Sequence, residues 1–169
     1  MDDWIAGFSS QSWHGQWSVL LATGYAMLLG GIVGFERELK DRPAGFRTHM
    51  LVAGAAALLV GLGDLVADHF GARQPHDILR MDAMRLIEAV VSAVGFLGAG
   101  AIFRRSGGSS VSGLTTAASL LMVAAIGIAA SVHANLLALG ATALTLGVLV
   151  LLEWFERRAG TRERERRDD

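Results

Sequence analysis

Two long stretches without charged residues constrain the fold of this chain most. No Asp, Glu, Lys or Arg occurs in the 32 residues Trp4–Phe35 or in the 47 residues Ser106–Leu152. A helix of a soluble domain carries polar or charged residues along its solvent face, whereas ~20 consecutive apolar residues cross a bilayer. Of all residues, 52% are hydrophobic and only 18% are charged. This pattern excludes a soluble enzyme domain, a disordered chain and a nucleic-acid-binding protein, and it predicts an all-α, polytopic integral membrane protein.

Five stretches are long and apolar enough to be predicted as transmembrane helices. The longest charge-free run is too long for one helix, and it breaks at its most polar part, Ser131–Asn135. We expect an extracytoplasmic N-terminal segment (1–16), a five-helix transmembrane domain (17–154) and a short, charged cytoplasmic tail (155–169). Residues 1–16 contain no Lys or Arg, so we expect no signal peptide there. The predicted helices are Trp17–Phe35, Phe46–Ala67, Ala83–Phe103, Ser112–Ala130 and Leu136–Trp154.

The distribution of basic residues predicts the orientation of the chain. Twelve of the 15 Lys and Arg residues lie after the first span, after the third span or in the tail. Cytoplasmic segments of membrane proteins are enriched in Lys and Arg. We therefore expect the N-terminus outside and the C-terminus in the cytoplasm. The arginines of the tail would anchor this orientation, with attraction to anionic lipid as an additional possibility.

Small residues on two predicted spans suggest close helix packing. Gly30 and Gly34 are four residues apart on the first span, and Gly95, Gly98 and Gly100 lie on the third. Small residues let helix backbones approach closely in a bilayer. The patterns predict packing within the chain, with a dimer face or a narrow polar path as the alternatives.

Polar residues gather at the predicted cytoplasmic ends of the spans. The first span ends in one such group and the second begins with another, across a short turn-forming stretch at residues 42–45. We therefore predict a polar binding cluster in which Arg47 lies close to the two carboxylates. A solvated helix end is the alternative. The predicted members are Glu36, Arg37, Glu38, Arg47, Thr48, His49, Arg104, Thr115 and Thr116.

A second polar group occurs where the third span begins. Asp82, Arg85 and Glu88 follow one another at intervals of three residues and share roughly one helix face. Ionisable groups inside a membrane are costly and normally face protein or water. We predict an outer cluster that faces other helices, as either a structural ion pair or a cation or proton site. The chain has no cysteine and no hydrolase motif or phosphate-binding loop, so we expect no enzymatic activity.

Three sequence blocks together resemble the MgtC/SapB family of bacterial inner-membrane proteins. In the first, Leu29–Glu38 (LGGIVGFERE) is followed by Pro43–Met50 (PAGFRTHM). In the second, Asp82-x-x-Arg85 leads into Val91–Gly100 (VSAVGFLGAG). In the third, Gly113–Leu120 (GLTTAASL) leads into Ala124–Gly127 (AAIG). The order and spacing of the blocks agree with the family over about residues 20 to 130.

This resemblance implies a role in magnesium homeostasis and adaptation to low magnesium, and in some relatives an association with virulence. It also implies that the chain binds other membrane proteins, such as the proton-driven ATP synthase. We therefore expect a non-enzymatic sensor or regulator in the bacterial inner membrane, surrounded by lipid and assembled as a homo-oligomer. The alternative is a transporter or channel for Mg²⁺ or protons. No cofactor is certain, but Mg²⁺ is possible, because oxygen-bearing side chains on several helices can bind hydrated Mg²⁺.

Overall fold

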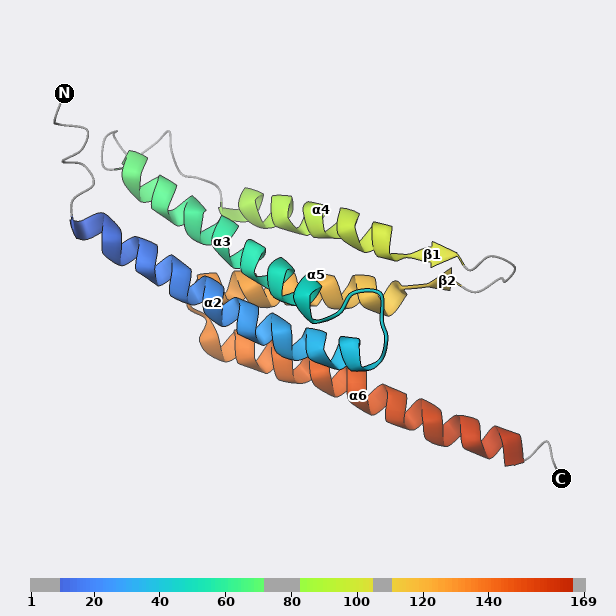
Figure 1. The fold of residues 1–169 in the computed structure, drawn as a ribbon. Coiled ribbons are helices and arrows are strands. Elements are labelled where there is room, and N and C mark those ends of the chain that lie inside the picture. The colour runs from blue at the N-terminus through green and yellow to red at the C-terminus, as the bar shows by residue number, and fades with distance from the viewer. Residues whose placement is uncertain (1–9, 72–82, 105–110, 166–169) are drawn as a thin grey trace.

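The computed structural model describes residues 10–71, 83–104 and 111–165, and five helices make up nearly all of these residues. Consecutive helices run in opposite directions and form an elongated bundle (Figure 1). The N-terminal end of α2 and the C-terminal end of α6 therefore lie at opposite ends of the bundle. The helices are α2 (Ser10–Leu39), α3 (Phe46–Gly71), α4 (Ala83–Ala101), α5 (Leu114–Ser131) and α6 (Asn135–Glu165).

Four of these helices are long and apolar enough to cross a membrane. Their apolar stretches are Trp13–Leu39, Phe46–Ala67, Met84–Ala101 and Leu114–Ser131. A helix satisfies its own backbone hydrogen bonds, which is required where no water is present. The described apolar part of α6, Asn135–Leu151, is shorter. The structure confirms a helical fold with four helices that could span a membrane, while the fifth crossing and the orientation stay predictions.

The structure differs from the predicted helix boundaries most at the two ends of the chain and between α4 and α5. Helix α2 begins at Ser10, inside the segment 1–16 that we assigned to the outside, and α6 continues to Glu165, beyond the predicted end at Trp154. Between α4 and α5, the short strands β1 (Phe103–Arg104) and β2 (Val111–Ser112) pair in antiparallel register. The structure is therefore helical with one small ladder, which sequence periodicity did not reveal.

Helix α5 is the central element of the bundle, because it packs against each of the other four described helices. Its glycine at position 127 lies so close to the backbone of α3 that an added Cβ would clash with the carbonyl oxygen of Ala53. Val123, Ala124 and Ile126 are fully buried around this contact. Small side chains therefore allow α5 to pack at short range against its neighbours.

The glycine predictions are confirmed for the first span and partly wrong for the third. A Cβ at Gly30 or Gly34 would lie within 2.8 Å of His49, on α3. A Cβ at Gly98 would contact Ala117 of α5 at 3.2 Å. Gly95 and Gly100 have open space around them. Within this chain they do not pack against another described helix, because they lie on the outward faces of α4.

Candidate functional site: a polar cluster joining four helices

The C-terminal end of α2 holds a carboxylate bound by two cationic side chains. Arg37 folds back along its helix and donates from Nε and Nη2 to Glu36, at 2.5 and 2.9 Å. Lys40 follows one turn later and forms an ion pair with the same carboxylate. Arg37 is almost completely buried, at 2% exposure. The nearby carboxylate therefore provides the charge compensation that a buried guanidinium requires.

Two further contacts connect this end of α2 to α6 and α3. The Lys40 ammonium donates to the backbone oxygen of Leu149 on α6, at 3.4 Å. On the other side, Glu38 accepts from the backbone N–H of Phe46 at 2.7 Å. That N–H is one of the unpaired donors at the first turn of α3, so the carboxylate caps the helix. Glu38, near the end of α2, thus contacts α3, and Lys40, just after this helix, contacts α6.

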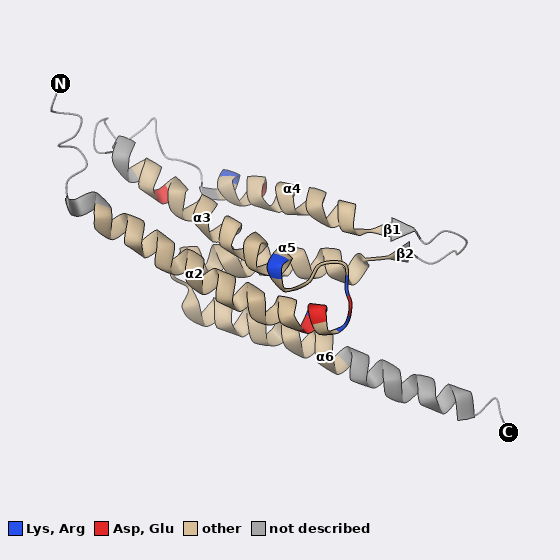
Figure 2. Cartoon of the chain, viewed as in Figure 1, with Lys and Arg blue, Asp and Glu red and all other residues tan. Residues whose placement is uncertain are grey.

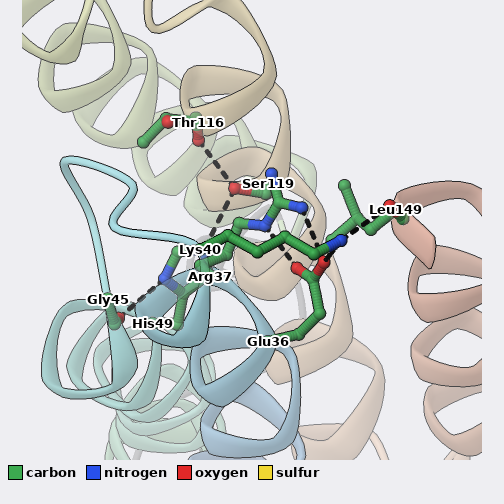
Figure 3. A network of polar contacts seen from close by, with 8 residues as sticks. All are labelled: Glu36, Arg37, Lys40, Gly45, His49, Thr116, Ser119 and Leu149. Atoms are coloured by element: carbon green, nitrogen blue, oxygen red, sulfur yellow. Dashed lines mark hydrogen bonds and ion pairs between the residues drawn. The ribbon is translucent and has the colours of Figure 1, made fainter. Parts of the chain in front are cut away.

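Buried hydrogen bonds extend the arrangement from α3 to α5. His49 is completely buried, and its two ring nitrogens contact different elements. Nδ1 lies 2.9 Å from the carbonyl oxygen of Gly45, and Nε2 lies 3.0 Å from the hydroxyl of Ser119 on α5. The Ser119 hydroxyl also donates to the carbonyl oxygen of Thr116 at 2.8 Å. We call Glu36, Arg37, Glu38, Lys40, His49 and Ser119 the polar cluster; Figure 3 shows most of its contacts.

The number of hydrogens available in this chain of bonds is limited. A carbonyl oxygen only accepts, so Nδ1 of His49 must carry a hydrogen. If Ser119 donates to Thr116, then Nε2 must donate to Ser119, and the imidazole carries two hydrogens and a positive charge. If the imidazole is neutral, the Ser119 hydrogen points to Nε2 instead. Protonation of His49 and the direction of the Ser119 hydroxyl are therefore coupled.

The charges of the polar cluster do not form an open cation site. The Glu36 carboxylate is already bound by Arg37 and Lys40, and Glu38 binds a backbone N–H. Among the described residues, no group of three or more His, Asp or Glu side chains could hold a metal ion. The arrangement is better suited to holding four helices in register than to surrounding a Mg²⁺ ion with oxygen ligands.

The other predicted residues of this end lie around the polar cluster. Arg47 follows the Phe46 amide that Glu38 binds, so the predicted proximity of Arg47 to the carboxylates is supported along the backbone. The Arg47, Thr48 and Thr115 side chains are exposed, whereas Thr116 is buried. Arg104 lies in β1, and its side chain is outside the described residues. Helix α5 itself begins after Gly113, which is its N-cap residue, and no side-chain hydrogen bond caps this end.

The two described residues of the predicted outer cluster lie on α4, and their side chains are not buried inside the bundle. Arg85 and Glu88 are both exposed on the first turns of this helix, where Figure 2 shows one blue and one red segment. The expectation that they face other helices of the same chain is therefore wrong. Asp82 lies outside the described residues. Sequence spacing placed the two charges on one helix face, but it could not show that this face points outward.

Sequence reasoning also missed two polar features, one in the polar cluster and one at the opposite end of the bundle. Lys40 was not among the predicted members of the cluster, because its i,i+4 spacing from Glu36 was interpreted as part of the alternative, a solvated helix end. A cavity of about 430 Å³ lies at the opposite end of the bundle, where α2, α5 and α6 meet. Its polar lining includes Ser18 and His133, whose side chains lie 3.3 Å apart. No periodicity signals a cavity that forms where three separate helix ends come together.

Comparisons with known proteins find relatives that match most of the described helices. The model of the MgtC family matches residues 24–158. Protein SapB of Bacillus subtilis is 33% identical over 157 residues, which cover 93% of this chain and 66% of SapB. Protein MgtC of Brucella abortus is 45% identical over 103 residues, covering 61% of this chain and 38% of that protein. Protein MgtC of Salmonella typhimurium is 39% identical over 128 residues, covering 75% of this chain and 49% of that protein.

The chain spans between about two fifths and two thirds of the length of these relatives. No solved structure matches it. The matched region includes residues 24–39 of α2, all of α3, α4 and α5, and α6 as far as residue 158, and thus every residue of the polar cluster.

Proposed function

We propose a role in magnesium homeostasis for this chain, which belongs to the MgtC family. The chain would act in the bacterial inner membrane as a non-enzymatic sensor or regulator of other membrane proteins. All five helices would cross the bilayer, with the N-terminus outside and the polar cluster on the cytoplasmic side. The bias of Lys and Arg toward this side supports the orientation, and the four long apolar helices support the membrane location.

One observation carries the regulatory part of the proposal: a single set of contacts joins the C-terminal end of α2, the N-terminal parts of α3 and α5, and the middle of α6. Glu36 binds Lys40, Lys40 binds α6, Glu38 binds α3, and His49 binds α5. A change in any of these contacts alters how the helix ends sit against one another. Packed helix contacts that have two alternative arrangements transmit a local change to a distant surface, and we propose that these contacts work in this way. The surface would meet a partner such as the proton-driven ATP synthase, which the family resemblance suggests.

The proposal can be tested by removing one positive charge from the polar cluster. Lys40→Gln removes the ammonium that joins Glu36 to α6. Arg42→Gln is the matched control, because it removes an exposed charge two residues away. Each variant is expressed in a bacterium that lacks its own MgtC-family protein, and growth is followed in low and in ample Mg²⁺. Membrane levels of the chain are measured in parallel.

We expect the unmodified chain and Arg42→Gln to restore growth in low Mg²⁺, and Lys40→Gln to fail at equal membrane levels. Equal restoration by both variants would contradict the role of the polar cluster. Failure of the unmodified chain would contradict the proposed link to magnesium.

Transport of an ion is the alternative function, and one observation favours protons over Mg²⁺. The hydrogen bonds from Gly45 through His49 to Ser119 form a buried chain in which a hydrogen can change its acceptor. Such chains carry protons in membrane proteins, whereas Mg²⁺ retains several waters and needs a wider, oxygen-lined path. Proton flux in vesicles that is lost in His49→Leu would favour this alternative.

A further inference from the structure

The outward face of α4 carries side chains that do not suit contact with lipid tails. Arg85, Glu88, Ser92, Gly95 and Ala99 are spaced at intervals of three and four residues, which places them along one stripe of the helix. All five are exposed. We call this stripe the α4 seam. It lies away from the buried positions Val90, Val94 and Gly98 of the same helix.

The exposed face of α2 is different. The exposed residues of α2 are mainly large and apolar, and they include Leu21, Leu28, Ile32 and Phe35. Such side chains fill the space between lipid tails. On the α4 seam, by contrast, the last three residues are small, and small residues favour contact with another helix. The seam therefore differs from the exposed face of α2 and has the small residues that occur at helix–helix interfaces.

The charges of the α4 seam give a second, independent reason for an interface. Glu88 lies five residues after Ala83, about 7.5 Å along the axis of a helix that can cross the membrane. Ionisable residues at such positions face protein or water and not lipid. Arg85 and Glu88 have opposite charges and lie one turn apart, so the stripe is electrostatically complementary to a second stripe like itself.

We propose that the α4 seam is the contact between two copies of this chain. Two copies inserted in the same direction can be related by a two-fold axis along the membrane normal, which places the same face of α4 on both sides of the contact. The seams then run side by side in parallel. Arg85 of each copy lies three residues, about 4.5 Å in axial rise, from the level of Glu88 in the other. Ser92, Gly95 and Ala99 allow the two backbones to approach.

A glycine substitution tests the proposal without disturbing the fold of the single chain. A Cβ at Gly95 meets no heavy atom within 4 Å, and the same holds for Gly100, which lies on another face of α4. Gly95→Leu is therefore the test variant and Gly100→Leu is the matched control. Leucine also has a higher helix propensity than glycine, so neither substitution should destabilise the single chain.

The oligomeric state of both variants is measured in vesicles by single-molecule photobleaching, over a range of protein-to-lipid ratios. We expect dimers for the unmodified chain and for Gly100→Leu, and a dimer dissociation constant raised at least ~10-fold for Gly95→Leu. A monomeric unmodified chain would overturn the proposal. So would equal dimerisation of both variants, or a seam that captures a different membrane protein while the chain itself stays monomeric.

A charge exchange between two copies tests the orientation. Arg85→Glu makes the seam of one copy wholly acidic, and Glu88→Arg makes the seam of another wholly basic. We expect each variant to self-associate poorly, and the two variants mixed together to form a dimer at close to the unmodified level. An ion pair within one chain cannot produce this rescue between chains. Absence of a preference for the mixed pair would overturn the parallel arrangement of the seams.

Discussion

Replacing Ser119 by alanine removes the one side chain that links buried His49 to α5. The hydroxyl takes part in two hydrogen bonds, one with His49 Nε2 at 3.0 Å and one with the Thr116 carbonyl at 2.8 Å. The second bond lies within α5, where the carbonyl also has a backbone partner. The substitution therefore affects mainly His49, because its Nε2 stays buried and loses the Ser119 hydroxyl as a hydrogen-bond partner.

The expected loss of stability follows from two measured ranges of free energy. Hydrogen bonds between helices in membrane proteins contribute ~0.6 kcal/mol on average and at most ~1.7 kcal/mol. A buried polar group that loses its partner costs about 1–3 kcal/mol. Because His49 is 0% exposed, water cannot replace the lost contact. We expect Ser119→Ala to lower the free energy of unfolding by about 1–1.7 kcal/mol, where the two ranges overlap.

The matched control is Thr142→Val, which removes another buried hydroxyl. Thr142 donates only to the carbonyl of Ala138 in its own helix, at 2.8 Å, as far as the described contacts show. Such back-bonding adds little to helix stability, and we expect a change within ~0.5 kcal/mol. The free energy of unfolding is measured by titrating mixed micelles with a denaturing detergent. A double-mutant cycle with His49→Leu isolates the pair, with an expected coupling of ~1 kcal/mol. A coupling below ~0.3 kcal/mol, or equal losses in Ser119→Ala and Thr142→Val, would refute the reasoning.

Two further predictions use the same unfolding measurement. Gly127→Leu should lower the free energy of unfolding by ~3 kcal/mol or more, because a side chain there clashes with the α3 backbone. Gly140 has open space around it, so Gly140→Leu should leave the free energy of unfolding unchanged or raise it by up to ~1 kcal/mol. Similar stabilities for the two would contradict the close packing of α3 and α5. Glu36→Gln should cost ~3 kcal/mol, the lower end of the range for broken buried pairs, because its side chain is 11% exposed. Adding Arg37→Gln should recover at least half of that loss, and additive losses would show that the two residues do not compensate each other.

The sequence predicted the helices well because their signal is local. Charge-free runs of apolar residues are long in this chain, and the break at Ser131–Asn135 was its most polar stretch. The structure places the turn between α5 and α6 there, with His133 in the left-handed region at a φ of 58°. The pairing of β1 with β2 was not predictable, because two residues are too few to show a period.

The candidate site was predictable where it depended on topology. The first span ends and the second begins on the same side of the membrane, so a short turn had to bring Glu38 close to the start of α3. The bond between Glu38 and the Phe46 amide confirms that proximity. Thr116 was predicted at this end and is buried, and its carbonyl accepts from Ser119, the α5 residue that bonds His49.

Other parts of the site depended on how helices rotate about their axes, which the sequence does not fix. Gly95 and Gly98 are only three residues apart, yet one has open space around it and the other packs against Ala117. In the same way, Glu88 was correctly placed on α4 but was expected to face inward. Which face of α4 points to the bundle is decided by its packing on α5 and α3, and this depends on residues distant in the sequence.

The central claim is that the polar cluster regulates through contacts between helices and does not conduct ions. The most direct measurement is the flux of Mg²⁺ and protons into sealed proteoliposomes that contain the purified chain, with fluorescent indicators inside. Protein-free vesicles set the background, and an ionophore for each ion shows that the indicators respond. The account predicts fluxes equal to the background for both ions, from a preparation whose unmodified chain restores growth in low Mg²⁺. Saturable Mg²⁺ uptake that Lys40→Gln abolishes, or proton flux that His49→Leu abolishes, would contradict it.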